Sequence, residues 1–296
     1  MAGAELPGFL ASELTRSEAA DSLFHVIPVP LEQSVSYGGG TGNGPAAIVE
    51  ASQQLEAFDG ISQPLDLGIH TTTAIECRGS IEAVLARIAE RCSTVLAGGH
   101  LPVLLGGEHT VTLGALQAIT TWSPSAVGLF QLDAHADLRD RYEGNRLSHA
   151  CVARRAHQDL GMPLFQFGVR ARCLEEERYR REHSIPGLDA ATLHRDGLAA
   201  LQLPADFPEA IYLSLDVDGL DPSVIRATGT PVPGGPGWYD TLAAIETVVR
   251  GRRVVGFDVV ELAPQVGDHA SSFAAAQLVY AVMGLIERNR SFSTAI

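Results

Sequence analysis

The stretch AVGLFQLDAHADLRD, residues 126–140, joins an apolar run to three closely spaced polar side chains. The apolar run predicts a buried strand, and Asp133, His135 and Asp137 follow it at alternate positions. Alternate side chains of an extended chain face the same side, so the three would converge on one point at the strand end. Two carboxylates and one imidazole suit a manganese-type ion better than a metal that prefers thiolates. A polar strand end closed by a turn is the competing interpretation.

Three more apolar runs end in polar clusters of the same kind. They are IYLSLDVDGLDPS (211–223) with Asp216 and Asp218, LPVLLGGEHT (101–110) with Glu108 and His109, and VVGFDVVELAP (254–264) with Asp258 and Glu261. Ligands and catalytic groups of an open parallel sheet gather beyond the carboxyl ends of its strands. The four strand ends therefore predict one shared crevice.

Strand-like and helix-like segments alternate along the chain. Apolar runs predict strands near 22–30, 65–69, 102–106, 127–133, 164–170, 211–216 and 254–260. Helices are predicted at 81–99, 110–121, 148–159, 174–183, 240–250 and 271–288. This alternation predicts an α/β fold, in which a mostly parallel sheet has helices on both faces.

The length of 296 residues is sufficient for one large domain, and we treat 1–296 as a single domain. Residues 1–20 are a candidate arm that is flexible or contacts another subunit. The Gly/Pro-rich stretch ATGTPVPGGPGW (227–238) lies between a strand end and a helix, so we interpret it as an active-site loop.

The composition of the chain indicates which partners and which cellular compartment to expect. A formal net charge of -14 argues against nucleic acid and acidic membranes as partners, and is compatible with a cationic substrate. The four cysteines have no C-x-x-C spacing, which predicts a reducing cytoplasm. The amino terminus has no signal-peptide pattern, and we expect no membrane span because no run approaches ~18 apolar residues.

Six motifs occur in the order GGEH, DAHAD, SHAC, SLDVDGLDP, ATGTP and DVVELAP between positions 106 and 264. Together with SYGGGTGNGPAAIVEAS (36–52), they resemble the ureohydrolase family, which includes arginase and agmatinase, and are most like agmatinases. The resemblance implies a three-layer arginase-like fold. It also implies a binuclear manganese hydrolase that cleaves a guanidino group and releases urea.

The same resemblance implies a set of ligands for two Mn²⁺ ions. One ion would be bound by His109, Asp133, Asp137 and Asp216, and the other by His135, Asp133, Asp216 and Asp218. Asp133 and Asp216 would therefore bridge the two ions, and Asp137 would also hold the attacking hydroxide.

Further roles follow from the resemblance. His149 would carry protons between solvent, the attacking water and the leaving amine, since an imidazole titrates near neutral pH. Glu261 would pair with the substrate guanidinium and orient its carbon. Thr230 is carried over only as a contact in the substrate pocket.

Two positions depart from the family pattern. Glu108 stands where the family more often has Asp, which lengthens a carboxylate near the ligands and is expected to alter metal tuning more than metal binding. Arg226 stands where Pro is usual, which leaves the shape of the following loop open.

The preferred substrate is agmatine, giving putrescine and urea in polyamine biosynthesis. Cys173 aligns with the Asp that holds the α-ammonium in arginases, and an apolar thiol cannot replace that charge. No basic group can be assigned to a substrate carboxylate. The run Glu175–Glu177 could attract a distal ammonium, although an ordinary acidic first turn of a helix is the simpler interpretation.

Several alternatives stay open. Arginine, 4-guanidinobutyrate or another guanidino acid could be the substrate, and a formimino compound is disfavoured by His149. A catalytically silent, metal-binding oligomer subunit is the alternative from another functional class, but silent relatives usually lose ligands or the acid/base residue. The resemblance also implies a homo-trimer or homo-hexamer.

Overall fold

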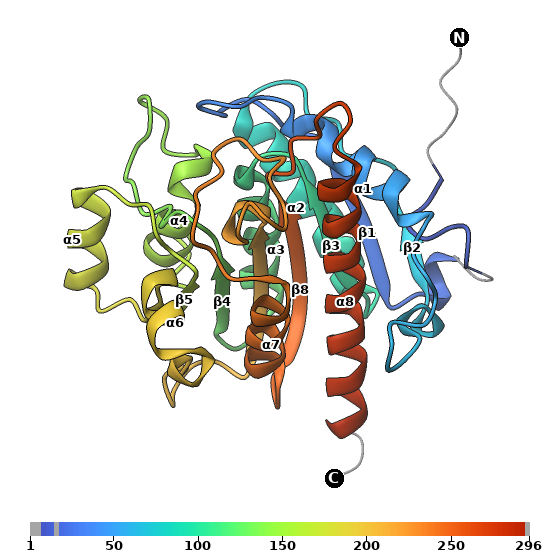
Figure 1. The fold of residues 1–296 in the computed structure, drawn as a ribbon. Coiled ribbons are helices and arrows are strands. Elements are labelled where there is room, and N and C mark those ends of the chain that lie inside the picture. The colour runs from blue at the N-terminus through green and yellow to red at the C-terminus, as the bar shows by residue number, and fades with distance from the viewer. Residues whose placement is uncertain (1–6, 15–17, 294–296) are drawn as a thin grey trace.

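The computed structural model describes residues 7–14 and 18–293. Within them, one sheet of eight parallel strands has the order β2-β1-β3-β8-β7-β4-β5-β6 (Figure 1). The strands are β1 (Phe24–Val29), β2 (Ile69–Thr71), β3 (Leu101–Gly106), β4 (Val127–Leu132), β5 (Leu164–Phe167), β6 (Gly187–Leu188), β7 (Ala210–Asp216) and β8 (Arg253–Val260).

The central strands are apolar because both of their faces are covered. Every residue of β3, β4 and β7 is buried, which explains why these segments read as continuous apolar runs rather than alternating ones. Short β6 closes one edge of the sheet and short β2 the other.

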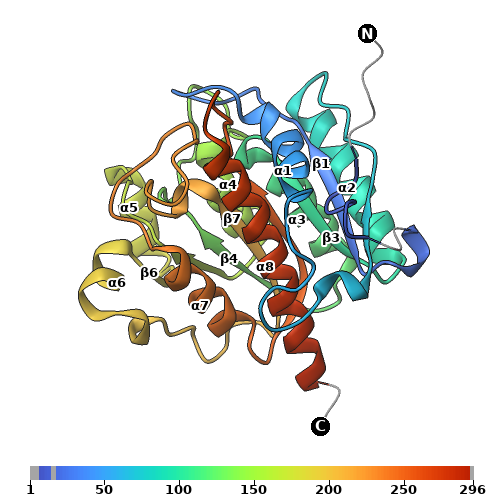
Figure 2. The same cartoon turned by 45° about the vertical axis from the view of Figure 1, so that its right-hand side comes forward.

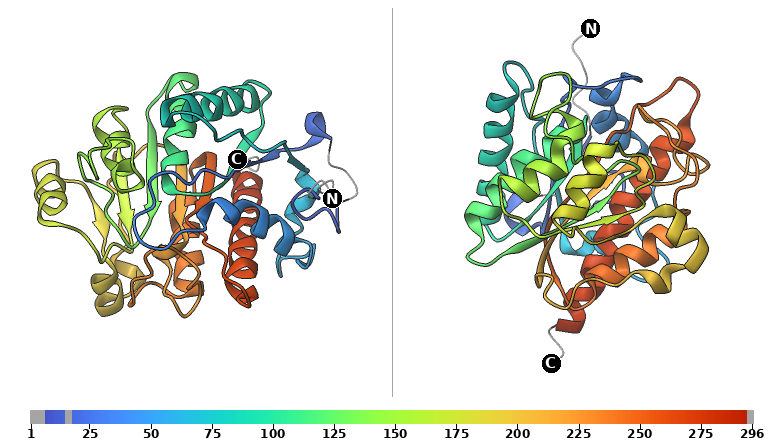
Figure 3. Two further views of the ribbon diagram at one scale, coloured as in Figure 1. Left: turned by 90° about the horizontal axis from the view of Figure 1, so that it is seen from above. Right: turned by 90° about the vertical axis from the view of Figure 1, so that its left-hand side faces the viewer.

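The helices form a layer on each side of the sheet (Figure 3). Side chains of α1 (Gly44–Ser52), α6 (Ala190–Asp196), α7 (Trp238–Val249) and α8 (His269–Ser293) belong to the core on one face. Those of α2 (Ile81–Ala97), α3 (Thr112–Trp122), α4 (Val152–Gln158) and α5 (Leu174–Glu182) belong to the core on the other. On the first face, α8 lies beside α1 and α7 (Figure 2).

The predicted fold class is confirmed, with local corrections. The strand predicted at 65–69 is wrong, because Pro64–Leu67 forms a 3-10 turn and β2 begins only at Ile69. The strand predicted at 164–170 ends at Phe167, since Gly168 turns the chain with a φ of 91°. The helix predicted at 148–159 begins at Val152, after a 3-10 turn. Helices α1 and α6 and strand β6 were not predicted, since they are short and lack a clear apolar period.

The predicted arm is only partly described. Residues 1–6 and 15–17 lie outside the described part of the chain, whereas Phe9 and Leu10 are fully buried. Their amides donate hydrogen bonds to Thr71 Oγ1 and Ser52 Oγ, both at 2.8 Å. This part of the segment therefore packs against its own subunit.

One helix among the described residues is long and apolar enough to cross a membrane, by length and composition alone. It is His269–Arg290, within α8, where 67% of the most apolar window is buried. Because core helices also pass such a test, this is weak evidence for a span.

Candidate metal centre

The site lies where four neighbouring strands end. In the sheet, β3, β8, β7 and β4 are adjacent, and their carboxyl ends lie at one edge because all four are parallel. Polar residues leave each strand there: His109 after β3, Asp133 after β4, Asp216 at the end of β7 and Glu261 after β8. The chain passes from β3 to β4 and only later fills the gap with β7 and β8, so this is a topological switch point.

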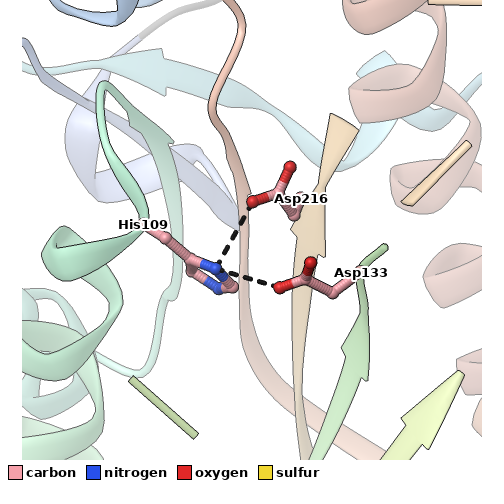
Figure 4. Close-up of side chains that lie close together, drawn as sticks. All are labelled: His109, Asp133 and Asp216. Carbon is pink, nitrogen blue, oxygen red and sulfur yellow. Dashed lines mark ion pairs between the residues drawn. The ribbon is translucent and has the colours of Figure 1, made fainter. Parts of the chain in front are cut away.

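Three carboxylates approach one nitrogen of His109. Its Nδ1 lies 3.3 Å from Asp133 Oδ2, 3.0 Å from Asp137 Oδ2 and 3.4 Å from Asp216 Oδ2. Figure 4 shows His109, Asp133 and Asp216 directed toward one another from separate segments. These three side chains could hold a metal ion.

A second group shares Asp133 with the first. His135 Nδ1 lies 3.6 Å from Asp133 Oδ1 and 3.0 Å from Asp218 Oδ2, and these three could also hold a metal ion. Asp133 therefore presents one oxygen to each histidine. The side chains at 133, 135 and 137 all reach the site, as predicted, but the expected extended chain is not observed, because β4 ends at Leu132 and Asp137 has a φ of 50°.

Hydrogen bonds behind His109 select its tautomer. Ser214 Oγ donates to Asp258 Oδ1 at 2.8 Å, so it accepts the hydrogen bond of His109 Nε2–H at 2.9 Å. Nδ1 then carries the lone pair, and it is buried without a hydrogen-bond partner among the described residues. An orphaned ring nitrogen that faces carboxylates is suited to a cation.

The charge of the cluster also fits divalent cations. Burial, reinforced by Asp133, raises the pKa of Asp137 to about 7. Burial likewise raises the pKa of Glu261 to about 8, and that of Asp216 lies well above its ordinary range. Buried like charges destabilise one another unless cations balance them. Oxygen-rich donors with two imidazoles suit ions such as manganese better than thiophilic metals.

Two side chains of the site sit on strained backbone. Asp137 has a φ of 50° and Glu261 a φ of 65°, values that are uncommon for residues other than glycine. The 3-10 turn after β7 packs closely against the end of β4, since a Cβ added to Gly219 would lie 2.8 Å from the amide nitrogen of Asp133. Such strain is typical of functional sites.

Glu261 and His149 border the cluster. Glu261 Oε1 accepts a hydrogen bond from the backbone amide of His109 at 2.7 Å, so the carboxylate is fixed beside the first group. His149 lies on the 3-10 turn that precedes α4, and its Nδ1 is 3.1 Å from Ser34 Oγ. Burial lowers the pKa of His149. Thr230 Oγ1 lies 3.5 Å from Asp218 Oδ2.

A cavity of about 380 Å³ opens onto these groups. Its wall includes Asp137, His149, Thr230 and Glu261, and also Cys173, as well as Arg139 and Arg172. Two arginines therefore line the cavity, although the sequence had given no basic group that could be assigned to a substrate carboxylate. Arg172 pairs with Glu177 at 2.6 Å and Asp189 at 3.1 Å, whereas Arg139 has only the ring of Tyr142, at 5.2 Å, as a partner among the described side chains.

The acidic run at the start of α5 is structural. The carboxylate of Glu176 accepts hydrogen bonds from the amides of Leu138 and Cys173. The bond from Cys173 is one half of a capping box, and the Cys173 side chain accepts the other half from the amide of Glu176. Glu177 is paired with Arg172 and Arg181. The interpretation as an ordinary first helical turn therefore fits these contacts.

The two departures from the family pattern are explained by their contacts. Glu108 Oε2 accepts hydrogen bonds from the amides of Gln33 and Ser34 at 2.5 and 2.6 Å, so this carboxylate holds a loop. Within the described part of the chain, its side chain makes no ion pair or hydrogen bond with a candidate ligand. Arg226 Nε donates to Asp268 Oδ2 at 3.0 Å, which ties the loop to the start of α8.

Some residues at the site were not predicted. Ser34 and Ser36 contact His149 from the segment between β1 and α1, and the guanidinium of Arg170 donates to five backbone carbonyls around Asp218. Nothing in their spacing indicated this, because most of these contacts are with residues far away in the sequence.

Comparison with known proteins places this geometry in a family. A family model described as "Arginase family" matches residues 22–284. The chain belongs to the arginase family. The resemblance of the sequence to ureohydrolases, and among them most to agmatinases, is thereby confirmed.

Similar arginase-family proteins cover nearly the whole chain. N(1)-aminopropylagmatine ureohydrolase of Synechocystis sp. is 36% identical, over 93% of this chain and 92% of that protein. Agmatinase of Pyrococcus horikoshii is 32% identical, over 93% and 96%. The crystal structure of agmatine ureohydrolase of Thermoplasma volcanium is 28% identical with a TM-score of 0.86, covering 98% of this chain and 97% of that one.

Proposed function

We propose that the protein is a manganese-dependent hydrolase that cleaves agmatine to putrescine and urea. The observation that carries the proposal is the pair of metal-capable groups that share Asp133, with Glu261 and His149 beside them. The names of its arginase-family relatives support the same reaction class.

The ligand assignment is part of the proposal. His109, Asp133, Asp137 and Asp216 would hold one Mn²⁺, and His135, Asp133, Asp216 and Asp218 the other. When bound, the ions would supply the positive charge that makes hydroxide available from water at neutral pH.

The protein residues would then orient the substrate. A guanidinium is planar and pairs well with a carboxylate, and Glu261 lies in the cavity wall with its backbone strained and Oε1 held by the amide of His109. Glu261 would therefore fix the guanidinium carbon beside Asp137. Asp137 would accept the hydrogen bond of the attacking oxygen, and Thr230 would contact the substrate.

His149 would transfer the protons. Its lowered pKa leaves the imidazole neutral at pH 7, so it can accept a proton. Hydrolysis of the C–N bond requires a proton on the departing amine, which His149, in the cavity wall, would donate.

The second candidate substrate is N(1)-aminopropylagmatine. Relatives at 36% and 38% identity carry the name of an N(1)-aminopropylagmatine ureohydrolase. A third candidate substrate is 4-guanidinobutyrate, since Arg139 lies in the cavity wall and an arginine can pair with the carboxylate of this compound.

The deciding experiment compares kcat/KM for four guanidino compounds with manganese-loaded protein. We expect agmatine or N(1)-aminopropylagmatine to exceed arginine by more than a hundredfold, because Cys173 leaves the α-ammonium unpaired and an imperfectly paired charge costs about 3 kcal/mol. A preference for 4-guanidinobutyrate would assign Arg139 to the distal carboxylate. Absence of urea with every compound would support the silent subunit instead.

The assembly and compartment are also proposals. We propose a homo-trimer or homo-hexamer, to be measured by light scattering of the purified protein. We propose a cytoplasmic location, on the basis of four free cysteines without disulfide-like spacing, to be measured by cell fractionation.

A further inference from the structure

Ser34 touches the proton-transfer histidine at two atoms. Its Oγ accepts a hydrogen bond from the backbone amide of His149 at 3.1 Å and lies 3.1 Å from His149 Nδ1. The same oxygen is 2.8 Å from Glu108 Oε1. A carboxylate, a hydroxyl and an imidazole from three separate segments are thus connected in series.

Glu108 is a fixed acceptor at the start of this series. Its side chain is 0% exposed, and Oε2 accepts hydrogen bonds from the amides of Gln33 and Ser34. The other oxygen, Oε1, is the acceptor of the hydrogen bond from Ser34 Oγ. The single hydroxyl hydrogen of Ser34 therefore points to Glu108 Oε1.

This assignment determines the hydrogen on His149. With its hydrogen directed to Glu108, Ser34 Oγ can only accept from Nδ1, so neutral His149 carries its hydrogen on Nδ1. Nε2 then holds the lone pair, and it lies 3.5 Å from Ser36 Oγ, which is part of the cavity wall. The weaker contact of Nδ1 with Ser148 Oγ, at 3.3 Å, is compatible with the same tautomer.

We propose that Ser34, oriented by Glu108, is a positioning residue that holds His149 in the Nδ1–H tautomer, with Nε2 as the proton-accepting atom. This inference rests on the proposed role of His149. The Nδ1–H contact is the same in neutral and protonated imidazole, so the ring keeps its place while Nε2 gains and loses a proton.

A double-mutant cycle tests whether Ser34 acts through His149. The His149→Ala variant should lower kcat by roughly 10²–10⁴. Ser34→Ala should lower kcat about tenfold, the effect of one hydrogen bond, with KM and bound manganese unchanged. In the His149→Ala background the same change should have no effect. An equal loss in both backgrounds, or no loss in the wild type, would overturn the proposal.

Rescue and pH dependence add readouts that a structural role would not affect. Ser34→Thr, which keeps a hydroxyl, should restore the rate. Ser34→Ala should shift the acidic limb of the kcat/KM profile, because loss of the acceptor changes the proton affinity of the ring. A Thr variant as slow as the Ala variant, or an unshifted limb, would count against Ser34.

The tautomer can be measured without activity. Nitrogen NMR of histidine-labelled protein, without added manganese and assigned by comparison with His149→Ala, should show Nδ1 protonated and Nε2 bare in the wild type. Protonated Nε2 would refute the proposal, even if the enzyme releases urea. If the NMR result is as expected but His149→Ala is fully active, the proposed function of His149 fails instead.

Discussion

Asp133 has a separate oxygen for each histidine of the site. Oδ2 lies 3.3 Å from His109 Nδ1, and Oδ1 lies 3.6 Å from His135 Nδ1. A carboxylate in this position can bridge two cations, whereas either histidine serves one. Asp133 is therefore a candidate ligand of both ions, whereas each histidine is a candidate ligand of one ion.

This difference predicts how many metal ions each variant retains. We expect Asp133→Asn to lose both manganese ions together, because the shared ligand is weakened for each, while His135→Ala should weaken mainly one. Elemental analysis of the purified variants measures the stoichiometry. If Asp133→Asn retains two full equivalents, the bridging assignment is wrong.

Glu261 provides the second prediction at this scale. We expect Glu261→Gln to lower kcat/KM by about 10–100-fold, because a hydrogen bond to a charged group contributes about 1.5–3 kcal/mol and the amide has no charge. Steady-state kinetics measures the loss, and unchanged metal content is the control. An unchanged kcat/KM would assign the guanidinium to another group.

Arg170 connects several elements around the site. Its guanidinium donates to the carbonyls of Gly168, Asp218, Gly219, Leu220 and Val232. The end of β5, the turn after β7 and the Gly/Pro-rich loop are thereby held together. The position of Asp218 thus depends on contacts between elements as well as on its own strand.

We expect Arg170→Lys to weaken this arrangement, because one ammonium cannot reach all of these carbonyls. The melting temperature should fall by about 5 °C, since each unsatisfied buried group costs about 1–3 kcal/mol. Manganese affinity should fall with it. The control is Arg195→Lys, which changes an exposed pair with Asp196. Equal melting temperatures for the two variants would contradict the prediction.

Strand β1 carries a buried histidine that predicts a pH effect. Burial lowers the pKa of His25, and the nearby His100 and His70 act in the same direction. Because the folded pKa lies below the unfolded value of about 6.5, the associated stability is present above pH 6.5 and is lost as the pH falls below it. His25→Gln should therefore lose less stability than the wild type between pH 7 and pH 5.

Thermal unfolding at several pH values measures this difference. A wild-type melting temperature that falls no faster than that of His25→Gln would show that other groups dominate the acid response.

At the scale of the whole molecule, bound metal should stabilise the fold. The candidate ligands come from the ends of three strands, β3, β4 and β7, so cations bound there would link segments more than 100 residues apart. Free manganese at a thousandfold above its Kd would contribute about 4 kcal/mol. Chelation should lower the melting temperature by on the order of 10 °C. Manganese should restore it, and a melting temperature insensitive to chelator would argue against the site.

Local patterns in the sequence determined much of the fold and the inner site. The runs of β3, β4, β7 and β8 are mostly apolar because both faces of these strands are buried, and polar residues follow at their ends. Asp133, His135 and Asp137 follow β4 within five positions, so their place at its carboxyl end could be predicted, although the chain there is no longer an extended strand. Such features depend on neighbours in the chain, so they could be predicted.

Only the tertiary structure decided the surroundings of the site. Ser34 meets His149 across 115 positions, and Glu261 meets the amide of His109 across 152. Arg139 and Arg172 lie in the cavity wall because of how their loops fold, and no periodic pattern in the sequence predicts this position. Short elements such as α1, α6 and β6 owe their stability to packing on the sheet rather than to their own pattern. Long-range contacts arise from the folded chain as a whole, and for this reason the sequence indicated the candidate ligands but not the residues that position them.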